Sequence, residues 1–401
     1  MKYTAYNNTK VDQQIDDHMK LIARELKIIL GKDLYSIILT GGFGRGEGSI
    51  LINPDNTVRI INDYDFEIVY RPKFGELLSK IIIKTKYTKA LSILEERLAR
   101  EIGVKQLDFT LRSLSDYPSV KKPKLSDYDT KYGHIVLCSE NDPTTLMPNF
   151  NNEDIPSFEG SWLLRNRGIG LLLAYFYLDR NKTPDCQATD NFYIEINKAL
   201  LAMGDALFII NKCYHHSYQR RLDTVDELAS TSFERITELI TLYKIAAEHK
   251  LRPKNDTFNA FETRELWHLV ANLYIDLFIY YESIRQKTKF VGVEHYVNNI
   301  PGKVSLNSKE KLRILYEFLL GNIKKSDIPL MGIIRDKAIN LGFTISLLAC
   351  LHDDKKHRKL FKNMPGNLGI TSQEVSKKYL LLSHPSGELA RFLNSKDTQG
   401  K

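Results

Sequence analysis

The sequence predicts an α+β protein, with a small mixed sheet and flanking helices first and a mainly α-helical part after it. Apolar runs that suit strands alternate with helical periodicity over residues 1–150, and helical periodicity alone continues over residues 151–401. Of the 401 residues, 43% are hydrophobic, enough for a substantial core. A chain of this length usually forms two or three domains. We therefore expect a mixed domain over residues 1–150 and a helical domain over residues 151–401.

The elements expected in the mixed domain follow one another closely. Residues 11–30 carry apolar side chains three or four positions apart, which predicts an amphipathic helix. Residues 35–40 form an apolar run that ends in glycines, which is typical of a buried strand. The segments that follow predict an extended stretch with alternating apolar residues, a helix and a short strand, over residues 56–70, 87–102 and 104–111.

The rest of the chain shows helical periodicity without strand-like alternation. Prolines separate many of the periodic segments, and prolines commonly end helices. The expected helices cover residues 161–179, 192–218, 224–250, 263–286, 309–322, 331–351 and 372–393.

Composition and charge restrict the class of protein. The four cysteines include no Cys-x-x-Cys pair, so neither a zinc site nor a disulfide framework is expected. No secretory signal begins the sequence, and the apolar runs fall short of the ~20 residues that span a bilayer. We expect a cytoplasmic protein without a membrane partner. Residues 1–150 carry 22 Lys and Arg against 20 Asp and Glu, so most of the net charge of +8 belongs to the helical part and favours a polyanionic partner such as RNA.

A glycine-rich turn follows the first expected strand, with the sequence LTGGFGRGEGS over residues 39–49. Glycine suits places where the backbone approaches an anion or adopts a positive φ angle, so the turn suggests a phosphate site. A Walker loop would need lysine before Ser49, and a dinucleotide fingerprint would need glycine where Glu47 stands. The turn therefore belongs to neither of these phosphate-binding loops.

Three acidic residues lie on expected strands nearby. Asp63 and Asp65 are two positions apart, so both side chains should point to the same face of the sheet. Asp108 lies in similar apolar surroundings on the next short strand. Neighbouring carboxylates repel one another unless a cation lies between them, and Mg²⁺ prefers carboxylates together with substrate phosphates. The pattern predicts a two-metal phosphoryl or nucleotidyl transfer site.

In this pattern the sequence resembles the nucleotidyltransferase superfamily that shares the fold of DNA polymerase beta. The resemblance covers about residues 35–111 and extends more weakly over residues 128–137. It implies that the backbone of Gly41 and Gly42 binds the phosphates of a nucleoside triphosphate, with Arg45 near them.

The resemblance further implies that Asp63, Asp65 and Asp108 bind Mg²⁺, or Mn²⁺, and that Asp108 helps to deprotonate the attacking hydroxyl. Two features depart from the family. Gly42 stands where a serine is frequent, so a side-chain phosphate contact is lost or moves to Ser49. The stretch that leads to Asp63 is long, which suggests an inserted hairpin around Pro54.

We therefore expect an enzyme that moves a nucleoside monophosphate from a nucleoside triphosphate to an acceptor hydroxyl and releases pyrophosphate. An RNA acceptor, such as a tRNA 3′ end, fits the basic helical part. A small molecule such as an aminoglycoside, a protein acceptor and the synthesis of a nucleotide second messenger stay open. A non-catalytic nucleotide-binding module is the alternative from another class of protein.

Several other polar residues allow both a structural and a functional interpretation. Glu67 continues the alternation of Asp63 and Asp65 and could be a fourth metal ligand, although a solvated or lysine-paired strand residue is the simpler interpretation. Asp205 interrupts an apolar run and needs a partner if it is buried. Arg165 and Arg167 could contact phosphates or pair with acids, and the basic run over residues 355–359 could contact an RNA backbone or face solvent.

Overall fold

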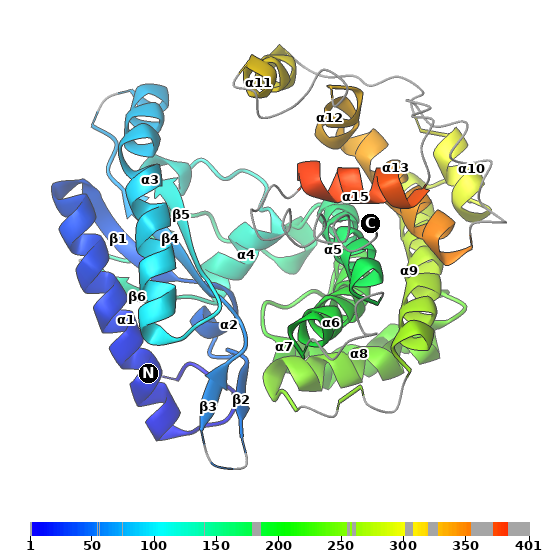
Figure 1. Cartoon of the computed structure of the whole chain (residues 1–401), viewed down its shortest axis with the longest axis horizontal. Helices are drawn as coiled ribbons and strands as arrows, with labels where there is room; N and C mark the ends of the chain where they lie inside the picture. The colour runs from blue at the N-terminus through cyan, green and yellow to red at the C-terminus, as the bar shows by residue number, and fades with distance from the viewer. Residues whose placement is uncertain are drawn as a thin grey trace, which may run out of the picture. The chain divides into compact units, whose positions relative to one another are not determined.

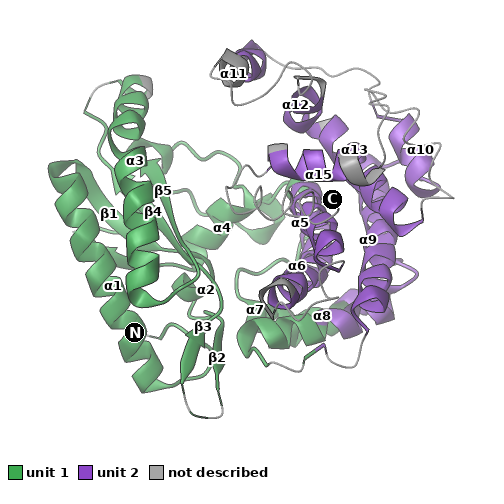
Figure 2. Ribbon diagram, in the orientation of Figure 1, with its two compact units in different colours: residues 1–159, 211–227, 244–257 green, residues 160–210, 228–243, 258–401 purple. Residues whose placement is uncertain are grey.

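The computed structural model describes residues 2–53, 55, 57–73, 75–139, 141–178, 186–254, 257–258, 262–300, 308–319, 328–353 and 372–383. It divides into two compact units (Figure 2). Unit 1 comprises Met1–Glu159, Asn211–Glu227 and Lys244–Thr257, and unit 2 comprises Gly160–Ile210, Leu228–Tyr243 and Phe258–Lys401. Unit 1 thus includes two short segments from the part of the chain that the periodicity assigns to the helical domain.

Unit 1 contains the sheet. Its strands are β1 (Leu34–Leu39), β2 (Ile50–Ile52), β3 (Val58–Ile60), β4 (Tyr64–Tyr70), β5 (Leu107–Ser113) and β6 (Ile135–Cys138). Four of them form one sheet in the order β5-β4-β1-β6, in which β4 and β5 are parallel and the other pairs antiparallel (Figure 1). The predicted small mixed sheet is confirmed. Strands β2 and β3 pair as the predicted hairpin, although Pro54 itself lies outside the described residues.

The helices of unit 1 are α1 (Thr9–Leu30), α2 (Gly41–Gly44), α3 (Glu76–Ile102), α4 (Leu125–Tyr132), α7 (Tyr218–Thr224) and the second half of α8 (Ile236–Leu251). Helices α1 and α3 pack on the same face of the sheet. Asn8 caps α1 by accepting hydrogen bonds from the N–H groups of Lys10 and Val11. Gly31, with φ of 51°, ends this helix.

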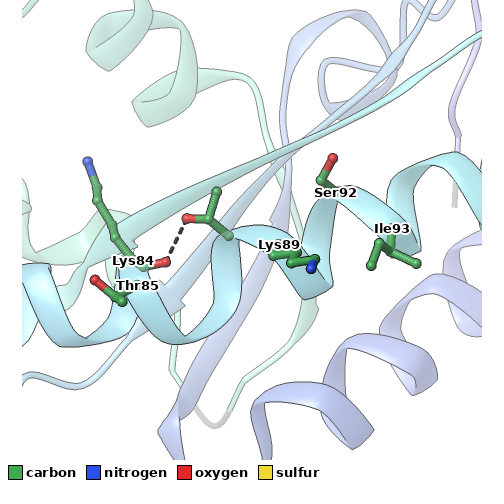
Figure 3. Close-up of a pocket in the computed structure, with 6 residues that line it drawn as sticks. Lys84, Thr85, Lys89, Ser92 and Ile93 are labelled. Atoms are coloured by element: carbon green, nitrogen blue, oxygen red, sulfur yellow. Dashed lines mark hydrogen bonds between the residues drawn. The ribbon is translucent and has the colours of Figure 1, made fainter. Parts of the chain in front are cut away.

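Helix α3 is longer than its periodicity predicts, since it starts at Glu76 rather than at residue 87. The added turns carry Ile81 and Ile82 on the exposed side, which masks the amphipathic pattern. Figure 3 shows part of the outer surface of α3, where Lys84, Thr85, Lys89, Ser92 and Ile93 line a shallow concavity. All the residues that line it belong to one helix, so it is a gap between rows of surface side chains.

Unit 2 is helical in its described residues, which confirms the helical part that the sequence predicts. Its helices include α5 (Ser157–Leu178), α6 (Cys186–Ile210), α9 (Thr263–Gln286), α10 (Gly292–Asn298), α11 (Ser308–Leu319), α12 (Ile328–Arg335), α13 (Lys337–His352) and α15 (Ser372–Ser383). Helix α9 packs against α6 and α13. No described helix has the length and apolarity that crossing a membrane would require.

Two expected helices were too long. The segment over residues 192–218 ends its helix at Ile210, because Lys212 adopts a left-handed φ of 59°. The segment over residues 224–250 begins its α-helix only at Ile236. Between them, Ser217 caps the short helix α7 by accepting a hydrogen bond from the Arg220 N–H.

Two of the ambiguous polar residues have partners inside unit 2. The buried Arg165 donates from Nε to Asn340 Oδ1 at 3.1 Å and from Nη2 to the Tyr379 hydroxyl at 3.2 Å. Asp205, 4% exposed, accepts a hydrogen bond of 3.0 Å from the Tyr243 hydroxyl. Both arrangements support the structural interpretation. Arg167 is half-buried, and the basic run over residues 355–359 lies outside the described residues.

Candidate functional site

Two of the predicted carboxylates meet on neighbouring strands. In the parallel pair of β4 and β5, Asp65 is in register with Asp108, so their backbones are about 4.8 Å apart. Asp63 comes just before the first residue of β4, and Asp63 and Asp108 both act electrostatically on Asp65. The structure thus brings together the three acidic residues that the sequence analysis grouped.

The alternation of the strands separates these acids from the core. Tyr64 and Phe66 of β4 and Phe109 of β5 belong to the core that α1 and α3 cover. Asp65 and Asp108 point to the opposite face, where Asp65 is half-buried and Asp108 is exposed. The sheet therefore presents carboxylates on the face that α1 and α3 leave uncovered.

The pKa of Asp65 is affected by its burial and by the charged groups around it. Burial, followed by the charges of Asp108 and Asp63, raises the pKa of Asp65 from its ordinary 3.8 to about 6. The cations of Lys250 and Arg45 act in the opposite direction and lower this pKa. Burial and the neighbouring carboxylates thus outweigh the two cations, and the charged form of Asp65 is disfavoured in the folded protein.

The glycine turn lies directly against Asp65. The end of β1 is held to β4 because the Thr40 N–H and hydroxyl donate to the Asp65 carbonyl at 2.8 and 3.2 Å. Gly41 follows with φ of 61°, and a Cβ atom at this position would collide with the Asp65 carboxylate. Position 41 thus requires glycine for its backbone angle and for the space that the carboxylate occupies.

A lysine that the sequence analysis did not select lies at the same turn. A Cβ atom on Gly42 would lie 3.3 Å from Lys250 Nζ, so the ammonium group of Lys250 lies close to the glycine backbone. Lys250 comes from the end of α8, about 200 residues after the turn, and belongs to unit 1. No motif surrounds it in the sequence, so pattern analysis had no signal that could have found it.

Arg45 is buried within unit 1. Its Nη1 atom lies 3.5 Å from Asp129 Oδ2 and its Nε atom 3.8 Å from Glu47 Oε2, with 9% of the side chain exposed. The guanidinium also lies over the Tyr218 ring, 5.6 Å from its centre. These contacts give Arg45 a place in the support of the glycine turn, while its charge still reaches Asp65.

Ser49 is also buried, and its hydroxyl donates to the Lys250 carbonyl at 2.6 Å. Nearby, Glu47 accepts hydrogen bonds from the Ser217 hydroxyl at 2.6 Å and from the N–H groups of Tyr218 and Gln219 at 2.9 and 3.1 Å. Glu47 and Ser49 therefore connect the glycine turn to the segments Asn211–Glu227 and Lys244–Thr257. These contacts explain why the two later segments belong to unit 1.

Glu67 is paired with a cation, although the partner is an arginine where the sequence suggested solvent or a lysine. Arg112 Nη1 donates to its carboxylate at 3.0 Å, and the Tyr117 hydroxyl donates at 2.7 Å. Arg112 also donates to Asp127 at 2.9 Å. Glu67 is therefore engaged in an ion-pair network next to the carboxylate group formed by Asp63, Asp65 and Asp108.

A divalent metal ion would need oxygen donors that lie close together at this site. Within the described ranges, no group of three or more His, Cys, Asp or Glu side chains is arranged to hold a metal ion. Mg²⁺ is commonly bound by only one or two carboxylates together with substrate phosphates, and Asp65 and Asp108 supply hard oxygen donors from adjacent strands. The residues present thus fit an ion shared with a phosphorylated ligand.

The described fold and site define a mixed α+β protein in which three acids lie beside a glycine turn on the open face of a sheet. No protein-family model, characterised protein or solved structure matches this chain. Its functional assignment therefore depends on the geometry of this site.

Proposed function

We propose that this protein is a nucleotidyltransferase that moves a nucleoside monophosphate from a nucleoside triphosphate to an acceptor hydroxyl. The observation that carries the proposal is the in-register pair of Asp65 and Asp108 beside Gly41, with the pKa of Asp65 raised to about 6. Unpaired carboxylates are unfavourable unless a cation offsets them, and a triphosphate bound with a divalent cation supplies one. The site is then complete only with its substrate.

The reaction forms a bond between the acceptor oxygen and the α phosphorus and breaks the bond from that phosphorus to the β-phosphate oxygen. Pyrophosphate leaves, and the proton of the acceptor hydroxyl passes to a carboxylate, for which we propose the exposed Asp108. Asp65 and Asp108 would hold Mg²⁺ or Mn²⁺ together with phosphate oxygens, with the charge of Asp63 nearby, and the ion when bound neutralises the phosphate charge. Gly41 and Gly42 would let the phosphates approach the backbone.

The structure suggests separate roles for the basic and polar residues of the turn. The ammonium group of Lys250 lies near Gly42, and we propose that it contacts a phosphate oxygen of the ligand. Arg45 and Ser49 are buried and have protein partners, so we propose that they position the turn. The proposal thus keeps Arg45 and Ser49 in the nucleotide site as support for residues that touch the ligand.

Transfer should be tested with each of the four α-labelled nucleoside triphosphates, Mg²⁺ or Mn²⁺, and a pool of acceptors. We expect labelled product and pyrophosphate from the native chain and none from the double variant Asp63→Ala, Asp65→Ala. Thr110→Ala, an exposed change two residues after Asp108 on β5, should keep activity. Tight nucleotide binding without transfer to any acceptor would favour the non-catalytic binding module.

The acceptor is proposed to be RNA, because the net charge of +8 is carried mostly outside residues 1–150. Binding of a tRNA pool should weaken steeply as salt rises, since phosphate contacts release counterions. Label that appears instead on an aminoglycoside, on protein or on a second nucleotide would replace RNA as the acceptor without changing the proposed reaction.

A further inference from the structure

A pocket of about 460 Å³ lies at the opposite end of the sheet from the carboxylates. It is lined by Tyr35 near the start of β1, Arg71 just after β4 and Cys138 at the end of β6. Because β1 is antiparallel to β4 and β6, these three positions share one end of the sheet. Gly41 and Asp65 lie at the other end, so this pocket is separate from the proposed transfer site.

Two cations line the pocket. Lys27, from the last turn of α1, and Arg71 both line it, and both have exposed side chains. Among the described residues, no Asp or Glu contributes to the lining. The Arg71 N–H donates to the carbonyl of Asp33, but the Asp33 carboxylate is already bound by Lys86 at 2.9 Å and by Tyr87 at 2.6 Å. Among the described residues, the charged groups that line the pocket are therefore both cations.

The guanidinium of Arg71 is held in place by an aromatic ring. It lies over the ring of Tyr35, 4.9 Å from the ring centre, in a cation–π contact. A guanidinium that is held in this way presents its N–H groups with less loss of side-chain entropy when an oxyanion binds. Arg71 is thus suited to a bidentate contact with a carboxylate or phosphate.

The remaining lining is mostly apolar. Leu34 of β1 and Val136 and Leu137 of β6 contribute half-buried side chains. Strand β6 is at the edge of the sheet. A volume of several hundred Å³ is in the usual range of sites for small ligands, and here polar and aliphatic side chains share the lining.

We propose that this pocket binds a small anion with an apolar body, its carboxylate or phosphate between Lys27 and Arg71 and its apolar part against Val136 and Leu137. The two cations are the reason to expect a negatively charged group on the ligand, and the aliphatic side chains are the reason to expect an apolar part. The site acts independently of nucleotide binding, because it is built on the other ends of the same strands.

Cys138 provides a reporter for occupancy, because it lines the pocket and is a half-buried free thiol. The rate at which N-ethylmaleimide alkylates Cys138 should be followed by mass spectrometry of the full chain, without metal or nucleotide. Phenyl phosphate and benzoate are the probes, and whichever protects better identifies the charged group. The likewise half-buried Cys213 is the internal reference, and its alkylation rate should not change. Inorganic phosphate, which lacks an apolar body, should protect only at much higher concentration.

Variants at the two cations test the proposed contacts. Arg71→Ala or Lys27→Ala should raise the concentration that gives half-protection by about tenfold or more, as loss of a charge-assisted hydrogen bond predicts. Arg71→Lys should fall between Arg71→Ala and the native chain. Lys10→Ala removes the same charge from the other end of α1 and should change nothing.

Three results would overturn the proposal: no protection by either probe at millimolar concentration, equal slowing of Cys138 and Cys213, or equal effects of Arg71→Ala and Lys10→Ala. Protection by an acidic peptide but by neither probe would also overturn it in favour of a protein partner. Repeating the measurement with Asp65→Asn separates this site from the transfer site, because that variant should be protected like the native chain.

Discussion

At the scale of single residues, the raised pKa of Asp65 links the stability of the unliganded protein to pH. An acid whose folded pKa is raised binds protons more tightly in the folded state, so its contribution to stability falls as pH rises through the interval from 3.8 to about 6. Above that interval the charged Asp65 opposes folding by an amount on the order of 2–3 kcal/mol. The charged Asp65 thus makes the unliganded protein less stable at neutral pH.

Asp65→Asn should therefore stabilise the unliganded protein at pH 8 and have little effect near pH 3.5. The reason is that asparagine removes a charge that burial disfavours and that Asp108 and Asp63 repel. Thermal unfolding at both pH values, with chelator present, measures the effect. Asp17→Asn, an exposed acid on α1, is the control. Equal melting temperatures of the native chain and Asp65→Asn at pH 8 would contradict the raised pKa.

Lys250 allows a second prediction at this scale. Lys250→Met keeps most of the side-chain volume and removes the ammonium group near Gly42. We expect about tenfold or greater loss of affinity for a non-hydrolysable nucleoside triphosphate, because a charge-assisted contact is lost. Calorimetric titration gives the affinity. The matched control is Lys244→Met on the same helix, where the half-buried lysine pairs with Asp226. Similar losses in both variants would remove Lys250 from the site.

At the scale of elements, the glycine turn depends on segments far away in the sequence. Glu47 connects it to α7 through Ser217, Tyr218 and Gln219. This carboxylate is only 6% exposed, so its hydrogen bonds replace water that it has lost. The turn and α7 should therefore lose stability together.

Glu47→Gln tests this connection. Glutamine keeps the shape but removes the charge and places an amide donor near N–H groups, so we expect a loss of about 2–4 kcal/mol in the free energy of unfolding. Urea denaturation measures it. Glu248→Gln, an exposed acid of α8 that pairs with Arg252, should change stability by less than about 0.5 kcal/mol. A loss no larger than that of the control would show that Glu47 does not hold the turn.

Local patterns in the sequence predicted the parts of the site that depend on neighbours along a strand. The grouping of Asp63 with Asp65, and their separation from the core, follow from a period of two residues. Strand β6 was not predicted, since its four residues are too few to establish a pattern. The partners of Arg45 could not be predicted either, because Asp129 lies 84 positions away and sequence spacing does not reveal contacts at that distance.

At the scale of the whole molecule, unit 1 is assembled from three stretches of chain. Its cooperative unfolding should therefore include α7, although more than 100 residues separate α7 from β5. Leu26→Ala in the core of unit 1, where Leu26 is 0% exposed, should cost about 2–5 kcal/mol. Hydrogen exchange under native conditions should then speed up in α7 as well as in α1.

The matching reference is α9, whose residues belong to unit 2 and should keep their protection. The opposite change, Leu277→Ala in the core of unit 2, should affect α9 and leave α7 protected. If α7 followed α9 in both variants, the division of the chain into these two units would be wrong.

The discontinuous composition of unit 1 also has a consequence for synthesis on the ribosome. Glu47 and Ser49 emerge early, but their partners Ser217 and Lys250 are made much later. At about 5–20 residues per second, the stretch from Glu159 to Thr257 takes roughly 5–20 s to translate. During that time the glycine turn lacks its contacts with Ser217 and Lys250, so the nascent chain would complete its candidate site only after α5, α6, α7 and α8 have been made.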